Sequence, residues 1–314
     1  MTDRTSDLVL ILKGKERSSA QQQTVDKVVR ILGLVVVYAF LAFIAILFLF
    51  PFYWMVITSL KTGEEIQLML PGMTMPSLWP KIIAWSNFTD LFGGKFNFGL
   101  YMGNTLIVGI ISTLGTLVTT VFAAYAFARL EFKGKNLLFV IFLATMMIPG
   151  EMMVITNYIT VSNLGMVSNN NIIGGFAAMI VPFWVSVFYI YLLRQNMKQV
   201  PNELYLAAKV DGKSDWNFLW HVMVPLVMPS LVTITILKLM GAWNGFVWPQ
   251  LIASGNEKLY LISVGLRMKF SSDDIANTGR QMAASTLVTA PLLLVFIFFR
   301  KYIMRGVGRA GIKG

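Results

Sequence analysis

The stretch that decides the fold is Ile31–Leu60, ILGLVVVYAFLAFIAILFLFPFYWMVITSL, which contains no charged residue. A helix of about 20 mostly apolar residues crosses the hydrocarbon core of a membrane, so this stretch is long enough to span it. It is too long for the apolar region of a signal peptide, it begins after 30 residues, and it lacks a small-residue cleavage site. We therefore predict that it is a retained membrane-spanning helix.

Five further apolar blocks follow this stretch. The chain of 314 residues is 56% hydrophobic and 13% charged, whereas soluble domains usually carry about 25% charged residues. Inside lipid the backbone must satisfy its own hydrogen bonds, so we expect each block to be helical. The sequence thus predicts an all-α membrane protein with six transmembrane helices. These are Ile31–Leu60, Thr105–Ala128, Asn136–Tyr158, Ile172–Leu193, Val222–Phe246 and Gln281–Phe299.

The segments around the spans complete one predicted membrane domain. Residues 1–30 form a cytoplasmic N-terminal tail, with an amphipathic helix near Asp7–Lys13, and residues 31–60 form the first transmembrane helix. An extracytoplasmic loop occupies residues 61–103, and a five-helix core occupies 104–303. Within this core, residues 194–221 form a cytoplasmic loop. Residues 304–314 form a cytoplasmic C-terminal tail.

The basic residues predict the orientation of the chain. With the N-terminus inside, the inner segments hold 18 Lys and Arg residues and the outer loops hold 7. Inner loops of membrane proteins are enriched in these residues, so both termini are expected in the cytoplasm of a multi-pass plasma or inner membrane protein. The net charge of +11 is spread over loops that flank the membrane, so we expect no nucleic-acid partner.

Several kinds of site are excluded by composition. The chain has no cysteine and one histidine, His221, so it has no disulfide and no cysteine or histidine metal cluster. The loop sequence GKS at Gly212–Ser214 is the end of a phosphate-binding motif, but Ala207 stands where that motif needs its first glycine. No strand is predicted before it. We expect no catalytic, cofactor-binding or metal-binding residue.

The stretch ELYLAAKVDGKSDWNFLWHVMVP, Glu203–Pro225, is unusually structured for a connecting loop. Pro201 suits the first position of a helix, and the Asp211-Gly212 pair predicts a break at which the glycine adopts positive φ. Ser214 or Asp215 can then cap a second helix. The pattern predicts a helix, a glycine turn and a helix. Composition alone favours an ordinary amphipathic surface pair.

The second span carries small residues every four positions. Such a face lets helix backbones approach closely, either within the chain or against another subunit, and the favoured interpretation is packing within the chain. The face consists of Ser112, Thr116, Thr120, Ala124 and Ala128.

Two charges fall inside predicted spans, Glu151 in the third and Lys238 in the fifth. Charges in hydrocarbon are costly and indicate function by default. At about 1.5 Å per residue, both lie at similar depth in straight helices. They are predicted to pair or to line one hydrated translocation cavity. The alternative is that Lys238 reaches the outer interface and Glu151 ends its helix.

Three polar or aromatic residues lie towards the outer ends of the same spans. Tyr158, Trp243 and Asn244 are candidates for contact with the transported solute, because aromatic faces and amides suit sugars. The favoured interpretation, however, is that they belong to the aromatic belt at the membrane interface.

The 203–225 stretch resembles the cytoplasmic motif of ABC importer permeases, in which Glu-Ala-Ala, three residues, Gly, nine residues and Ile-x-Leu-Pro follow one another. Ala207 and Ala208 match the two alanines, Gly212 matches the glycine, and Val222–Pro225 matches the end. Leu206 departs from the pattern because it stands in the glutamate place. Glu203, one helical turn earlier, is the nearest acid that compensates.

Other stretches resemble the second permease of maltose-type, carbohydrate-uptake importers, and together they cover nearly everything from residue 31 onward. They are SLKTGEEI (59–66), NTLIVGIIST (104–113), AYAFARLEFKGKN (124–136), AWNGFVWPQLI (242–252) and RGVGRAGIKG (305–314).

This resemblance implies the type I ABC importer permease fold and a role in binding-protein-dependent sugar transport. It implies four kinds of partner besides membrane lipid: a second, non-identical permease, an ATPase dimer, an extracytoplasmic binding protein and a sugar. The chain itself holds no cofactor, since ATP and Mg belong to the ATPase. The implied ATPase-coupling residues of the 194–221 loop and its exit are Glu203, Ala207, Ala208, Asp211, Gly212 and Pro225.

Two alternatives stay open at this point. One is an ion-coupled secondary transporter, which needs no ATPase and often shows inverted repeats, although none is evident here. The other is an ABC importer of a different polar solute, such as glycerol phosphate.

Overall fold

The structure is a computed structural model that describes residues 4–69, 77–93, 96–167, 171–270 and 277–308. For residues 4–26, 28 and 301–308 it describes the backbone alone. Every regular element in these ranges is a helix, as the sequence predicts. The chain divides into two compact units, residues 1–57 and residues 58–314.

The first unit consists of one long helix. Helix α1 runs from Arg4 to Ser59 and passes through both the polar N-terminal stretch and the first predicted span. Its part from Val29 to Ser59 is long and apolar enough to cross a membrane. The predicted boundary at residue 30 is therefore a change of composition and not a break in the backbone.

The second unit contains the other five predicted spans. Two are single helices, α4 (Phe98–Arg129) and α15 (Thr278–Gly308). The other three are bent pairs, so the residues that the structure describes contain up to six candidate spans when each pair counts as one. The pairs are α5 (Lys135–Ala144) and η1 (Thr145–Met147) with η2 (Gly150–Met153) and α6 (Val154–Asn163); α7 (Ile172–Ile180) and η3 (Val181–Phe183) with α8 (Val187–Lys198); and α10 (Asp215–Phe218), η4 (Leu219–Met223) and α11 (Val224–Leu226) with α12 (Met228–Asn244).

The bends overturn the depth estimate for Glu151 and Lys238, which treated the third and fifth spans as straight helices. The third span turns by 86° and the fifth by 76°. Prolines lie at both turns, Pro149 before η2 and Pro229 in the first turn of α12. A proline lacks the backbone N–H that would continue the helical ladder, and its ring clashes with the preceding turn. These positions therefore end one helical segment and begin another.

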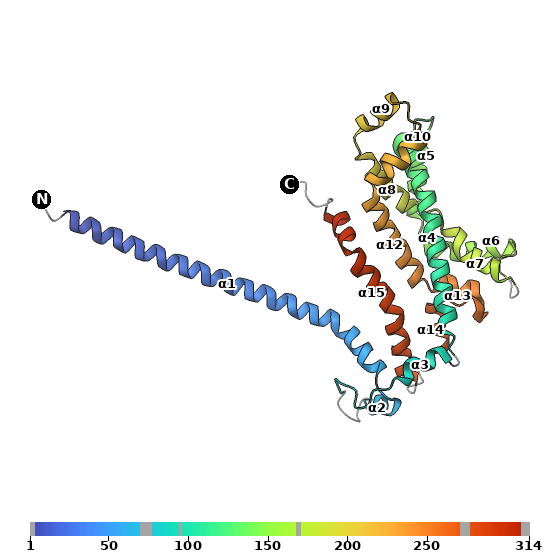
Figure 1. The fold of residues 1–314 in the computed structure, drawn as a ribbon, viewed down its shortest axis with the longest axis horizontal. Helices are drawn as coiled ribbons and strands as arrows, with labels where there is room; N and C mark the ends of the chain where they lie inside the picture. The colour runs from blue at the N-terminus through green and yellow to red at the C-terminus, as the bar shows by residue number, and fades with distance from the viewer. Residues whose placement is uncertain (1–3, 70–76, 94–95, 168–170, 271–276, 309–314) are drawn as a thin grey trace. The chain divides into compact units, whose positions relative to one another are not determined.

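The remaining helices lie in the connections between spans. Helices α9 and α10 lie at one end of the second unit together with the start of α5, and α2 and α3 lie at the opposite end (Figure 1). The connecting helices are α2 (Gly63–Gln67), α3 (Ser86–Gly93), α9 (Asn202–Val210), α13 (Val247–Ala253), η5 (Glu257–Leu259) and α14 (Ile262–Lys269). We call the α9–α10 end the inner end and the α2–α3 end the outer end.

The stretch that follows the first span folds into a small polar cluster at the outer end. Thr62 caps helix α2 by accepting from the Glu65 amide. The Asn87 side chain donates to the carbonyls of Ser59, at 2.9 Å, and Lys61, at 2.8 Å. The SLKTGEEI motif thus anchors the loop between the first two spans. Part of that loop, including residues 70–76, lies outside the described ranges.

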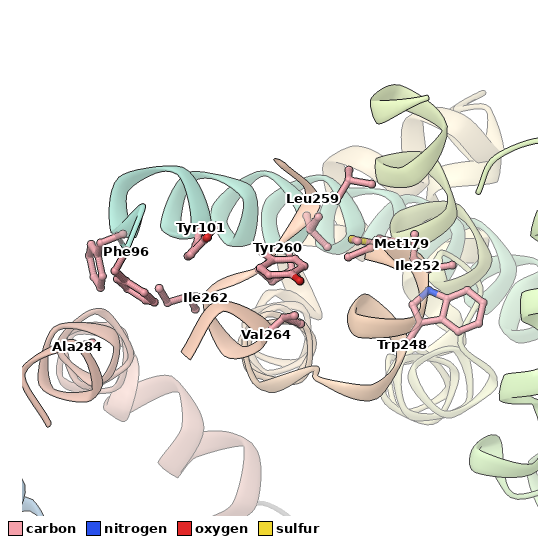
Figure 2. Packing of buried hydrophobic residues seen from close by; sticks show 14 of the residues in the cluster. Phe96, Tyr101, Met179, Trp248, Ile252, Leu259, Tyr260, Ile262, Val264 and Ala284 are labelled. Atoms are coloured by element: carbon pink, nitrogen blue, oxygen red, sulfur yellow. The ribbon is translucent and has the colours of Figure 1, made fainter. Parts of the chain in front are cut away.

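The outer core fixes the 257–265 segment against the start of α4. Figure 2 shows Tyr101, Tyr260 and Ile262 within this apolar cluster. The Asn104 amide donates to the carbonyls of Lys258 and Tyr260, at 2.9 and 3.0 Å. These contacts leave little freedom, because a Cβ at Gly265 would lie 2.4 Å from the Tyr101 ring.

A second apolar core lies under the inner end. It joins the last turns of α4, helix α8 and the helices from α10 to α12. Val121, Leu193, Phe218 and Met223 are all buried in it. This core is the surface on which the α9–α10 connection rests.

Candidate functional site

The connection between the fourth and fifth spans is a helix, a glycine turn and a helix, as predicted. Pro201, with φ −54°, directly precedes α9 and is its cap. Gly212 has φ +73°, a conformation that is costly for residues with a side chain. The amide of Lys213 donates to Ala208 O and that of Gly212 to Lys209 O. This is the Schellman arrangement that ends helices at glycine.

The second helix of the connection begins where the sequence predicts. The Ser214 hydroxyl accepts from the Asn217 amide at 3.2 Å and caps α10. Asp215 is then the first residue of that helix, not its cap.

Asp215 holds α9 against α10 and α4. Its carboxylate accepts from the Tyr205 hydroxyl at 2.7 Å, from Lys209 Nζ at 3.0 Å and from the Tyr125 hydroxyl at 3.3 Å. Tyr205 also packs edge-on against Phe218. The hydrogen bond to Asp215 raises the pKa of Lys209, so the ammonium stays charged. Sequence reasoning missed this network, because the tyrosine of α4 lies 90 positions away from Asp215.

The opposite face of α9 is exposed and largely apolar. Glu203, Leu206, Ala207 and Val210 are all exposed, and their spacing of three and four residues places them on one side of the helix. Leu206 is 55% and Val210 88% exposed. We call these four residues the α9 outer face.

The remaining predicted coupling residues do not all belong to this face. Ala208 is half-buried and packs on the inner core, so the two motif alanines point to different surroundings. Asp211 is exposed and ends α9. Pro225 is exposed in α11, just before the bend of the fifth span.

The second candidate site is built around the break in the fourth span. Between η3 and α8 the helix bends by 45°, and this frees the carbonyls of Phe183 and Trp184. Thr116 donates to Phe183 O at 3.0 Å and Thr119 to Trp184 O at 2.6 Å. The small-residue face of α4 thus packs within the chain, as favoured from the sequence.

Lys238 donates a hydrogen bond to a carbonyl at the same break. Its Nζ lies 3.1 Å from the carbonyl oxygen of Phe183 and 5.7 Å from the centre of that ring. It also lines a cavity of about 420 Å³, in which it is the single charged lining residue. Ser112, Ser186 and Tyr189 supply hydroxyl groups to the cavity wall.

The predicted pairing of Glu151 with Lys238 is absent from the ion pairs of the described residues. Glu151 is exposed in η2, the short helix that begins directly after Pro149. The depth estimate assumed two straight helices, and the 86° bend of the third span invalidates it. Lys238 instead satisfies a helix-end carbonyl, a favourable place for a cation.

The aromatic and amide candidates lie apart from the cavity lining. Trp243 is 4% exposed, and its Nε1 has no hydrogen-bond partner. Tyr158 is half-buried and packs against the outer core, whereas Asn244 is exposed at the end of α12. Of the five predicted pathway residues, Lys238 alone lines the cavity.

Comparisons with known proteins fit this geometry. A family model described as "Binding-protein-dependent transport system inner membrane component" matches residues 117–309. The arabinooligosaccharides transport system permease protein AraQ of Bacillus subtilis (strain 168) is 29% identical over 275 residues, which are 88% of this chain and 94% of AraQ. The sn-glycerol-3-phosphate transport system permease protein UgpE of Yersinia pestis bv. Antiqua (strain Antiqua) is 26% identical over 265 residues, 83% of this chain and 91% of UgpE.

One solved structure shares the fold. It is described as the crystal structure of a bacterial ABC transporter involved in the import of the acidic polysaccharide alginate. It matches with a TM-score of 0.75 at 23% identity, over 87% of this chain and 96% of the other.

Proposed function

The chain belongs to the family of binding-protein-dependent transport system inner membrane components, and from this premise we propose that it forms half of the translocation pathway of an oligosaccharide importer. Members of this family work in ABC importers with an ATPase and a solute-binding protein. The chain is therefore a multi-pass membrane transport subunit and not an enzyme. Family membership also removes the ion-coupled secondary transporter from consideration.

The observation that carries the coupling role is the α9 outer face. We propose that Glu203, Leu206, Ala207 and Val210 dock on the ATPase. The Gly212 turn and the Asp215 network transmit the movement of α9 to α10 and the fifth span. Support comes from the 88% exposure of Val210, which is large for an apolar side chain. Further support comes from the polar contacts that Tyr205 and Lys209, on the opposite face of α9, make with Asp215.

The orientation of the chain follows from the same proposal. The inner end, with α9, faces the cytoplasm, where the ATPase lies, and both termini are cytoplasmic. The distribution of Lys and Arg supports this orientation. The outer end then receives the binding protein, and a second, non-identical permease completes the pathway.

We propose that Lys238 lines the translocation path. Its Nζ donates to the Phe183 carbonyl at 3.1 Å, and the residue lines the cavity of about 420 Å³. Ammonium and hydroxyl groups hydrogen-bond well to the hydroxyls of a sugar. Glu151, Tyr158, Trp243 and Asn244 remain candidates that act only once the second permease is in place.

The solute class is proposed from the relatives. AraQ is named for arabinooligosaccharides, which favours an oligosaccharide. UgpE is named for sn-glycerol-3-phosphate, which keeps a small phosphorylated solute as the second candidate.

The test is reconstitution of the chain with its partner permease, ATPase and binding protein in proteoliposomes. We expect ATP-dependent uptake of an oligosaccharide, and loss of uptake when the ATPase is omitted. Uptake of glycerol 3-phosphate without oligosaccharide uptake would replace the first solute class by the second. Uptake without any ATPase would contradict the proposed function.

A further inference from the structure

A second cavity lies at the inner end, at the turn between the second and third spans. Its volume is about 460 Å³, and it is an open pocket lined by the end of α4, the start of α5 and the end of α8. Three cations, Lys135, Arg194 and Lys198, line it against one anion, Glu131. We call it the basic pocket. The transport mechanism proposed above does not use it.

Arg194 is the buried cation of the basic pocket. Its side chain is 7% exposed, its guanidinium lies 3.7 Å from the centre of the Phe139 ring, and its Nε donates to Phe127 O at 3.1 Å. Among the described contacts, the two terminal nitrogens have neither a hydrogen-bond partner nor an ion pair. A guanidinium fixed in this way is prepared to bind an oxyanion.

The start of α5 adds backbone donors to the same pocket. Gly134 precedes the helix with φ +80° and has no side chain to cap it. Asn136 and Leu137 of the first turn line the pocket. Amides at an uncapped helix N-terminus, together with the positive end of the helix dipole, bind anions.

An apolar track leads away from the pocket along α5. Leu137 lines the pocket and is 66% exposed, and Val140 and Ile141 are 62% and 55% exposed. Their spacing of three and four residues places them on one face of α5. A ligand that fills the basic pocket and also lies along the apolar face of α5 has a compact anionic group and a long apolar tail.

We propose that the basic pocket binds the phosphate of an anionic phospholipid headgroup, with an acyl chain along Leu137, Val140 and Ile141. Lys135 is paired with Glu131 at 3.3 Å, but the Glu131 side chain is 89% exposed and can turn away from the headgroup. Basic pockets at the inner ends of membrane helices attract such lipids. Inorganic phosphate shares the chemistry of the headgroup but lacks the apolar tail.

The test is native mass spectrometry of the purified transporter titrated with phosphatidylglycerol, phosphatidylcholine or inorganic phosphate. We compare Lys198→Gln and the double variant Lys135→Gln/Lys198→Gln with Lys133→Gln. Lys133 is an exposed lysine of the same turn that does not line the pocket. We expect tight binding of phosphatidylglycerol, about fivefold weaker in Lys198→Gln and about 20-fold weaker in the double variant. Lys133→Gln should bind like the unaltered protein.

Three results would overturn the proposal. One is equal binding of phosphatidylglycerol and phosphatidylcholine, and another is equal binding by the double variant and Lys133→Gln. The third is complete displacement of the lipid by inorganic phosphate at similar concentration, which would assign the site to a free anion. A thermal melt of each variant separates loss of the ligand from loss of the fold. The readout is independent of uptake, so failure of the proposed transport function would not affect it.

Discussion

The two ends of the 58–314 unit hold their connecting segments in different ways. At the outer end, the 257–265 segment is fixed by buried contacts: Asn104 donates to two of its carbonyls, and a Cβ at Gly265 would clash with the Tyr101 ring. At the inner end, α9 is held on one side by the polar Asp215 network and is exposed on the other.

The two segments therefore owe their positions to different contacts. The outer segment is positioned by the chain itself, because its apolar side chains are buried in the outer core. The inner segment has a defined shape and tether but leaves the α9 outer face open for another protein. Substitutions at the outer end should therefore mainly lower stability. Substitutions at the inner end should reduce transport more than they reduce stability.

The largest effect on stability is expected for Gly265→Ala. The new Cβ would lie 2.4 Å from Cδ2 of Tyr101, and such overpacking costs about 1–3 kcal/mol. A lowered melting temperature of the purified transporter is the measurement. Gly99→Ala in α4 is the matched control, since nothing lies within 4 Å of its new Cβ. Equal melting temperatures for the two variants would show that the outer end is not tightly packed.

Gly212→Val comes next, because it places a β-branched residue at φ +73°. The left-handed conformation costs a residue with a side chain about 1–2 kcal/mol, and α9 can relieve it only by changing the turn. We expect normal membrane assembly with uptake reduced at least about tenfold, measured in proteoliposomes at matched protein levels. Gly212→Asn should keep most uptake, because asparagine tolerates this conformation. Normal uptake in the valine variant would refute the role of the turn.

Tyr205→Phe removes the 2.7 Å hydrogen bond to Asp215 and keeps the ring on Phe218. We expect a loss of about 1 kcal/mol and partial uncoupling, seen as ATP hydrolysis that no longer matches uptake. Tyr191→Phe is the control, since this tyrosine is exposed and lies outside the network. If the ratio of ATP hydrolysed to solute transported stays unchanged, the Tyr205–Asp215 hydrogen bond does not transmit the movement of α9.

The smallest effect on stability is expected for Leu206→Glu, which restores the family's acid on the exposed α9 outer face. A surface substitution changes stability by less than about 0.5 kcal/mol. Uptake should nevertheless fall, because the new carboxylate would be buried in the apolar contact that we propose between Leu206 and the ATPase. Leu206→Met keeps the apolar volume and should retain uptake. Higher uptake in the glutamate variant would show that the ATPase socket is basic.

Much of the fold was predictable because its signals are local. The charge-free Ile31–Leu60 stretch predicts a span by composition alone, and Gly212 after Asp211 predicts the turn by the conformation that glycine allows. Pro149 marks a break, but no local rule gives the 86° by which the span turns.

The parts that escaped prediction depend on contacts between distant segments. The Asp215 network needs Tyr125 from α4, and the position of Lys238 depends on a carbonyl freed by a break 55 residues away. Straight helices would place Glu151 and Lys238 at similar depth, so a pair was a reasonable expectation. The bend of the third span makes that depth estimate invalid. Periodicity reports which face of a helix is apolar, but it does not report where a bent helix places its ends.

The kink of the third span limits what can surround it in a bilayer. Residues 144–153 are exposed in succession, and the helical hydrogen-bond ladder is interrupted among them at Pro149. Acyl chains can neither donate to nor accept from loose peptide groups, and each such group would cost several kcal/mol in hydrocarbon. The fourth span solves the same problem with threonines of its own chain. Among the described residues, no side chain hydrogen-bonds to the backbone of residues 144–153 in the same way. We therefore expect protein or water, and not lipid, beside this kink.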